Sequence, residues 1–183
     1  IARAGRVTTF PARFQLIAAM NPCPCGLAGS TADGRCACTD DVIARYERRV
    51  SGPLRDRIDL IVPMARVPAT TLVALAEPES SAVVARRIAD VRARSTARNG
   101  GRLNARLRGR DLRTRCPLDP SARRRLVDLS EAEAASGRGT ERLLRVARTI
   151  ADLAGAPDVA AEHLDEASWF GTGGGPRRDA LAS

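Results

Sequence analysis

The sequence has 183 residues, enough for one ordinary domain or two small ones with a buried core. Its hydrophobic content of 44% and charged content of 28% are typical of a soluble globular protein. No apolar run approaches the roughly 20 residues that span a bilayer, so we expect a cytoplasmic protein without a membrane partner.

The net charge is +9, and every basic residue other than the single histidine is an arginine. A GC-rich genome favours arginine codons, but a basic surface also attracts a polyanion such as nucleic acid. The lack of lysine excludes a P-loop from these residues, because that loop uses a lysine to reach the β- and γ-phosphates. The chain starts without methionine inside what looks like a structural element, so we expect a fragment of a longer protein.

The first predicted elements are two strands, at residues 6–9 and 14–20, with Pro11 between them. The second strand reads FQLIAAM and is apolar nearly throughout, which is typical of a parallel strand covered by helices on both faces. Asn21 follows at its carboxyl end, where open α/β sheets bind ligands. A turn residue before Pro22 is an equally good interpretation of Asn21.

Two CxC pairs come next, Cys23/Cys25 and Cys36/Cys38, on either side of a loop rich in Gly, Ser and Asp. Four nearby thiols in a chain without a secretory signal predict a structural zinc site with tetrahedral coordination. Disulfides and four free thiols are the alternatives. Cys116 stands alone and is predicted to be a small buried or idle residue and not a metal ligand.

A helix is predicted at residues 40–50 with Thr39 as its N-cap. A short turn or helix at 54–59 and a last strand at 60–64 follow. Arg57 lies directly before that strand. Taken by itself, Arg57 suits a solvated ion pair with Asp56 or Asp59.

Prolines mark a linker that ends near residue 78, and the rest of the sequence is predicted to be helical. His163, the only histidine, falls in a helical apolar setting and is predicted to be structural. A basic connector with leucine anchors is expected at 103–115, and a disordered tail at 171–183. The helices are predicted at residues 79–98, 119–135, 140–154 and 158–169. The fold class is therefore α/β followed by all-α.

Several motifs together resemble a known family. They are PARFQLIAAMNPCPCG, CAC, RRVSGPLRDRIDL, RNGGRLNARL, SGRGTERLLRVARTIADLAG and HLDEA, in this order between residue 1 and about residue 170. The chain resembles the AAA+ ATPases of the magnesium-chelatase-related ComM/YifB group. The resemblance implies that residues 1–78 are the C-terminal half of a AAA+ P-loop-type core, with the cysteine loop, and that 79–170 are the helical lid. The cysteines favour this group over the magnesium chelatase subunit itself.

The resemblance also implies roles for four residues. Asn21 matches sensor 1, which orients the attacking water, and Arg57 matches the arginine finger, which reaches ATP held by a neighbouring subunit. Arg138 matches sensor 2, and Arg145 is a second candidate for that role. A fixed arginine at the γ-phosphate contributes about 10³–10⁵ in rate. The chain departs from the family at Arg55, where an apolar residue is usual, and the family's P-loop and acidic Mg²⁺-binding strand have no counterpart among these residues.

The function implied by the resemblance is hydrolysis of ATP with Mg²⁺ at the subunit interfaces of a ring, expected to be a hexamer. The work done by such a ring would be DNA remodelling, such as helicase-like branch migration. By itself, this chain is expected to have no ATPase activity. Two alternatives remain: a zinc-stabilised module that binds nucleic acid without enzymatic activity, and a magnesium chelatase subunit.

Overall fold

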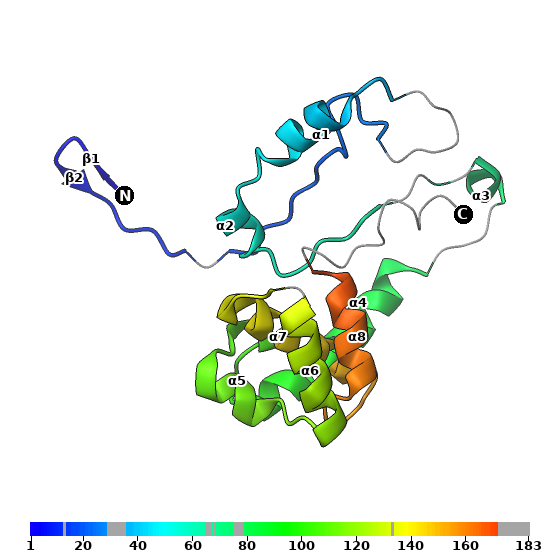
Figure 1. Ribbon diagram of the computed structural model, residues 1–183. Helices are drawn as coiled ribbons and strands as arrows, with labels where there is room; N and C mark the ends of the chain where they lie inside the picture. Colours follow the sequence, from blue (N-terminus) through cyan, green and yellow to red (C-terminus); the bar gives the residue numbers. More distant parts are fainter. Residues whose placement is uncertain are drawn as a thin grey trace.

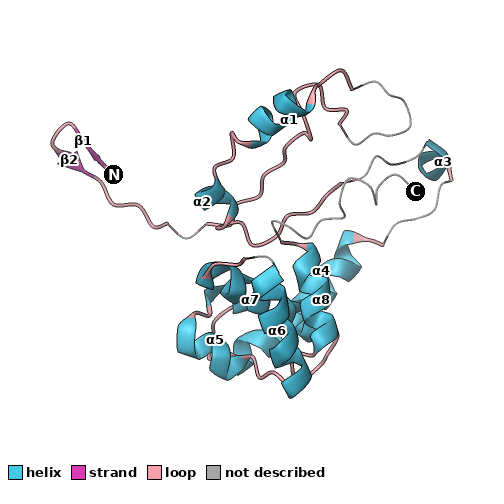
Figure 2. Ribbon diagram, viewed as in Figure 1, coloured by secondary structure: helices cyan, strands magenta, loops and turns pink. Residues whose placement is uncertain are grey.

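The computed structural model describes residues 1–12, 14–28, 36–64, 67, 69–74, 79–132 and 134–171. These residues form a mostly helical structure with one two-stranded sheet. Helices α4 to α8 gather into a bundle, whereas the earlier residues form extended segments and short helices outside it (Figures 1 and 2). No helix in the described part of the chain is both long enough and apolar enough to cross a membrane.

The sheet is a hairpin at the N-terminus. Strand β1 (Ala2–Arg3) pairs antiparallel with β2 (Arg6–Val7). The turn between them uses positive φ angles of 50° at Ala4 and 75° at Gly5. Of the strand predicted at residues 6–9, only the first two residues form a strand. Its partner is β1, which directly precedes it in the sequence.

The strands predicted at 14–20 and 60–64 are wrong for this structure, since neither segment has regular structure in its described residues. Their apolar side chains are exposed, to 84% at Ile17 and 86% at Met64. A β-strand needs neighbours that accept and donate its backbone hydrogen bonds. Among the described residues no strand pairs with either segment. The amide of Ile61 donates to the carbonyl of Phe170, at the end of α8, and not to a strand.

Three short helices lie between the hairpin and the bundle. Helix α1 (Asp40–Glu47) starts where it was predicted, with Thr39 at the N-cap position, but the Thr39 side chain makes no capping hydrogen bond. Two acidic residues in the first turn favour the helix through its dipole. Helix α2 (Gly52–Arg55) has its proline within the first turn, and α3 (Ala69–Val73) lies in the predicted linker.

Helix α4 (Ser81–Arg98) agrees closely with its prediction. The hydroxyl of Ser80 caps it by accepting from the backbone amide of Val83 at 3.4 Å. It ends at Asn99, where Gly100 and Gly101 adopt φ angles of 63° and 83°. The backbone amide of Gly101 then donates to the carbonyl of Thr96 at 2.7 Å, which satisfies an end group of the helix.

The rest of the bundle contains more helix than predicted. Its elements are the 3₁₀ turn η1 (Asn104–Arg106), α5 (Gly109–Arg115), α6 (Pro120–Ala132), α7 (Gly137–Leu153) and α8 (Ala161–Trp169). The segment at 103–115 was predicted as a connector, yet it forms η1 and α5. Two of its leucines pack into the core as the predicted anchors, because Leu107 and Leu112 are fully buried. The tail predicted at 171–183 lies outside the described residues after Gly171.

Helix α7 forms the centre of the core. The stripe predicted on this helix comprises Leu143, Ala147, Ile150 and Ala154. Leu143 and Ala147 are buried, Ile150 is partly buried and Ala154 is exposed. The apolar side chains of α4 are only partly buried, since Val91 is covered while Val83 is 49% exposed. The buried hydrophobic cluster comprises Leu107, Leu112, Cys116, Ala122, Leu143, Leu144, Ala147, Ala151, Val159, Leu164 and Ala167. Cys116 is therefore a core residue, as predicted.

A buried polar network joins α4 and η1 to the end of α7. Asp152 accepts hydrogen bonds from Arg98, from Asn104 Nδ2 at 2.8 Å and from Arg148 Nε at 3.2 Å. Arg148 is itself fully buried and also donates to the backbone carbonyls of residues 156 and 157. The network satisfies charges that the bundle removes from water.

Helices α6 and α8 also start with polar caps. Asp119 Oδ1 accepts from the backbone amide of Ala122 at 2.7 Å at the start of α6. His163 is 6% exposed, and its Nδ1 accepts from the backbone amide of Ala160 at 2.9 Å at the start of α8. The histidine therefore has the structural role that the sequence predicted.

Candidate functional site

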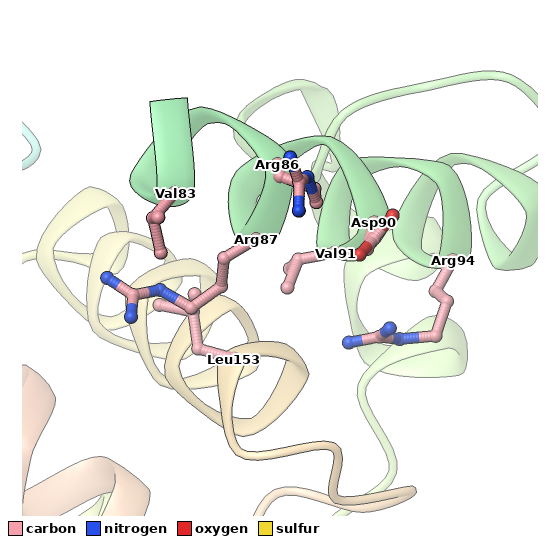
Figure 3. A pocket seen from close by; sticks show the side chains of 7 residues that line it. All are labelled: Val83, Arg86, Arg87, Asp90, Val91, Arg94 and Leu153. Carbon is pink, nitrogen blue, oxygen red and sulfur yellow. The ribbon is translucent and has the colours of Figure 1, made fainter. Parts of the chain in front are cut away.

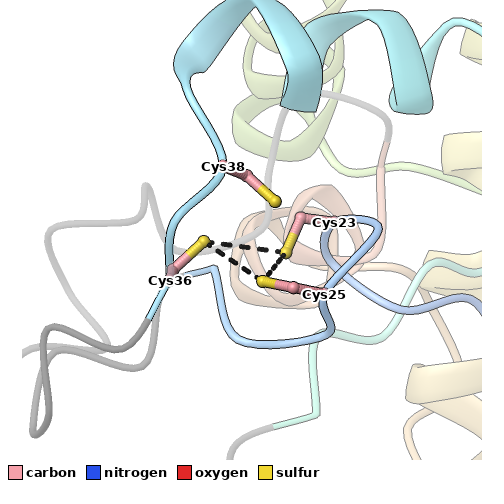
Figure 4. Close-up of side chains that lie close together, drawn as sticks. All are labelled: Cys23, Cys25, Cys36 and Cys38. Atoms are coloured by element: carbon pink, nitrogen blue, oxygen red, sulfur yellow. Dashed lines mark hydrogen bonds between the residues drawn. The ribbon is translucent and has the colours of Figure 1, made fainter.

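The four cysteines of the two CxC pairs come together in space, and we call them the cysteine cluster (Figure 4). Their Sγ atoms all lie within 4.8 Å of one another. Cys23 and Cys25 are 3.2 Å apart, and Cys25 and Cys36 are 3.5 Å apart. Cys23 is buried, Cys25 is exposed, and the other two are partly buried. A soft divalent metal ion could be held by such a set of thiolates.

The backbone around the cluster favours a thiolate on Cys23. Burial by itself would raise the pKa of the Cys23 thiol. Hydrogen bonds from the Cys25 thiol and from backbone amides, including that of Ala28, outweigh burial and lower this pKa to about 6. The hydrogen bond to the Cys38 backbone would lower the pKa of Cys36, but burial and the neighbouring sulfurs raise it to about 11.

Asn21, the predicted sensor 1, lies against the first turn of the cysteine cluster. The amide of Gly26 donates to the carbonyl of Cys23 at 3.0 Å and closes this turn. A Cβ placed on Gly26 would stand 3.7 Å from Asn21 Nδ2, so the side-chain amide packs directly over the glycine. Asn21 itself is exposed.

Arg57, the predicted arginine finger, follows α2 and is exposed. One guanidinium nitrogen donates to the carbonyl of Pro53 at 2.6 Å. The ion pair with Asp59 that the sequence allowed is absent among the described residues, because Asp59 pairs with Arg145 instead. The bond to Pro53 anchors the side chain while part of the guanidinium remains accessible.

The two sensor 2 candidates occupy different environments on α7. Arg138 is the second residue of the helix and is exposed. Arg145 lies two turns later and is buried, with its guanidinium 3.1 Å from Asp59 Oδ1 and 3.6 Å from Glu141 Oε2. Arg145 is thus held by two carboxylates, whereas Arg138 faces solvent.

Residues 56–61 contact α7, and we call them the arginine-finger segment after the predicted role of Arg57. Asp56, beside Arg57, lines an open surface hollow together with Arg138 and Glu141. The ion pair between Arg145 and Asp59 also joins this segment to α7. In addition, the amide of Ile61 donates to the carbonyl of Phe170 at 3.1 Å. Asn21 does not line this hollow.

Sequence reasoning missed the residues that hold this arrangement. Asp59 was considered only as a partner for Arg57, and Glu141 was not singled out. Glu141 accepts from the backbone amide of Gly109 at 2.9 Å and so also fixes the start of α5. Arg108 is a further cation in this region. Burial and the nearby charge of Arg145 lower the pKa of its guanidinium. The i, i+4 spacing of Glu141 and Arg145 was the available signal.

A second surface hollow lies between α4 and the end of α7 (Figure 3). Val83, Val91 and Leu153 give it apolar surface. Its polar lining residues are Arg86, Arg87, Asp90 and Arg94. None of the residues predicted as catalytic lines this hollow, so it is separate from the arginine-finger region.

Comparison with known proteins places these features in a family. The profile of the magnesium chelatase subunit ChlI matches residues 1–72, and the profile of its C-terminal region matches residues 78–170. The chain belongs to the magnesium chelatase ChlI family. The matches together cover the cysteine cluster, the arginine-finger segment and the bundle.

Relatives in this family include a YifB protein of Salmonella typhimurium, which is 40% identical over 91% of this chain. A protein of Mycobacterium bovis is 38% identical over 93% of the chain, and the competence protein ComM of Haemophilus influenzae is 36% identical over 91%. The aligned part is 32% to 34% of each relative's length. The chain therefore spans about a third of the relatives that it matches.

Proposed function

We propose that this chain is the C-terminal part of a AAA+ ATPase that hydrolyses ATP with Mg²⁺ at the subunit interfaces of a cytoplasmic ring, expected to be a hexamer. Residues 1–78 would complete the α/β nucleotide-binding core, and residues 79–170 would be its helical lid. In such a core, strands from the rest of the protein would pair with the exposed apolar segments at 14–20 and 60–64.

The observation that carries the proposal is the attachment of the arginine-finger segment to α7. The Arg145–Asp59 ion pair attaches the segment that carries Arg57 to α7, and Asp56 of that segment lines the same hollow as Arg138. Both contacts support a proposed role of this region in binding phosphate. Phosphoryl transfer depends on positioned positive charge more than on covalent chemistry. Arginine suits this task because its planar guanidinium stays charged and binds phosphate oxygens in pairs.

The different environments of the two sensor 2 candidates support different proposed roles. Arg138 is exposed and free to reach a nucleotide phosphate, so we assign sensor 2 to Arg138. Arg145 is buried against Asp59 and Glu141 and would act as a positioning residue for the finger segment. Arg57 would stabilise charge on the γ-phosphate of a neighbouring subunit, and Asn21 would orient the attacking water.

ATP turnover by the full-length protein tests this assignment. Arg57→Ala and Arg138→Ala should each lower turnover strongly, by up to about 10³–10⁵ for the finger. Arg48→Ala removes an exposed arginine at the end of α1 and serves as the matched control. Turnover unchanged in Arg57→Ala, or lost equally in the control, would contradict the proposal. The chain of 183 residues should show no turnover by itself, because it has no lysine for a phosphate-binding loop.

We further propose DNA as the substrate of the remodelling reaction. Charge is divided unevenly along the bundle: residues 81–115 contain eleven arginines and two acidic residues, whereas residues 116–171 contain more acidic residues than arginines. A basic segment of this kind suits phosphate contacts that do not depend on sequence.

The same observation favours the second candidate function, a zinc-stabilised nucleic-acid-binding module without ATPase activity. The two candidates differ in a direct test. Steep loss of DNA binding with salt by this chain, together with no ATP turnover by the full-length protein, would favour the module. ATP turnover that depends on Arg57 would favour the ring ATPase.

A further inference from the structure

We propose that the cysteine cluster binds one zinc ion as a structural tetrahedral site, and that the bound ion fixes the turn on which Asn21 rests. The first part stands on the cluster alone. The second part rests on the proposed role of Asn21 in ATP hydrolysis.

The sulfur positions already match a tetrahedral thiolate site. Four sulfurs at about 2.3 Å from one zinc ion lie roughly 3.8 Å from one another. In the structure Cys23 and Cys36 are 3.8 Å apart, and all four sulfurs lie within 4.8 Å. Zinc would therefore need sulfur shifts on the order of 1 Å or less. Such a site would be structural, because four protein ligands leave no open position for a substrate.

Disulfides fit the same geometry less well. A disulfide requires its two sulfurs to be about 2.05 Å apart, and it joins them in pairs. Here Cys23 is near both Cys25 and Cys36, and Cys25 is near Cys36 as well, so the sulfurs form one compact group. Four thiolates this close repel one another unless a cation lies between them. On zinc binding, each thiol releases its proton to solvent, and no oxidant or reductant is needed.

The backbone supplies the outer contacts of a metal site. The amide of Ala28 donates to Cys23 Sγ at 3.3 Å. Outer hydrogen bonds of this kind orient metal ligands and tune their basicity. Cys23 is buried, so its sulfur is protected from solvent while Cys25 lies at the surface.

Asn21 is connected to this site through Gly26. The turn from Cys23 closes through the Gly26 amide, and Gly26 adopts a φ of 79°, which side chains other than glycine rarely adopt. The Asn21 amide lies over the glycine, where a Cβ would contact it at 3.7 Å. An ion that fixes the two cysteines of this turn therefore also fixes the surface beneath Asn21.

Metal content of the purified chain tests the first part. We expect one zinc ion per chain, and the visible absorption of a tetrahedral cobalt thiolate when Co²⁺ replaces zinc. Cys25→Ser and Cys38→Ser should lose the metal, whereas Cys116→Ser should retain it, because Cys116 lies in the core of the bundle. A metal-free chain with four reactive thiols, or cluster variants that keep the metal as well as Cys116→Ser does, would overturn the site.

The side-chain amide signals of Asn21 in NMR spectra test the second part. Removing zinc with a chelator should shift the Asn21 signals, while those of Asn99 and Asn104 in the bundle should stay unchanged. Gly26→Ala should shift the Asn21 signals and weaken zinc binding roughly tenfold. If neither zinc removal nor Gly26→Ala shifts the Asn21 signals, the proposal that the bound ion positions Asn21 is overturned. These measurements use no nucleotide, so failure of the ATPase proposal would leave the metal result intact.

Discussion

Removal of the carboxylate of Asp152 is expected to destabilise the helical bundle more than any surface charge change. The Asp152 side chain is 4% exposed and bonds to Arg98, Asn104 and Arg148. Asp152→Ala would leave the fully buried guanidinium of Arg148 without its carboxylate. Breaking a buried pair from one side costs about 3–5 kcal/mol. A bundle of this size has roughly 5–14 kcal/mol of total stability, so the loss is a large fraction.

Thermal unfolding followed by far-UV circular dichroism measures this loss, because most of the regular helix lies in the bundle. We expect the midpoint to fall by roughly 12–40 °C, since 1 kcal/mol corresponds to about 4–8 °C in domains of this length. Asp165→Ala is the matched control. Asp165 pairs with Arg125 at 2.5 Å, but both side chains are more than 40% exposed, so the expected loss is below about 1 kcal/mol. Equal shifts in the two variants would refute the reasoning.

Two further outcomes follow from the bundle. Burial alone would raise the pKa of Asp152, but hydrogen bonds from Arg98 and Asn104 lower it. The stability gained from this carboxylate is therefore complete above the unfolded pKa of about 3.9 and is lost as pH falls through the lower folded pKa. Urea unfolding should show the stability difference between wild type and Asp152→Asn shrinking below about pH 4, and a constant difference would contradict this. Gly171→Ala should cost about 1–3 kcal/mol in the same assay, because its Cβ would lie 3.1 Å from the Ser168 carbonyl oxygen, whereas Gly137→Ala, with open space around its Cβ, should not destabilise.

The helices of the bundle could be predicted because their signals are local. Ser80 caps α4, and Asn99 with the two glycines after it ends the helix, as capping and positive-φ preferences require. Helix α7 shows its apolar stripe at the period of 3.6 residues. The sequence did not show that two charged residues of this helix, Arg148 and Asp152, would be buried. Arg148 and Asp152 look like an ordinary exposed i, i+4 pair until α4 and η1 cover them.

The strands could not be predicted correctly, because strand structure depends on a partner. The sequence at 14–20 has the apolar character of a buried strand, and nothing in it specifies which segment pairs with it. In a parallel sheet, the hydrogen bonds of a strand come from residues at least a dozen positions away in sequence. The structure has this segment extended and exposed, which agrees with its local preference and not with the predicted burial.

The candidate site was predicted in part. The spacing of the cysteines indicated a cluster, and the structure gathers all four. The contact between Arg145 and Asp59 was not predicted, because 86 residues separate the two side chains in sequence. The roles of Asn21, Arg57 and Arg138 stay predictions, supported by the family and by the position of the finger segment against α7.

A subunit-mixing measurement of ATP turnover tests the central claim most directly. Full-length protein with Arg57→Ala is mixed with full-length protein inactivated in its nucleotide-binding loop. Neither variant should turn over ATP by itself. The mixture should regain turnover, because some interfaces then unite an intact loop with an intact Arg57 from the neighbouring subunit. Full activity of Arg57→Ala by itself would contradict the claim that Arg57 completes the ATP site, and a mixture without activity would contradict its action across the interface.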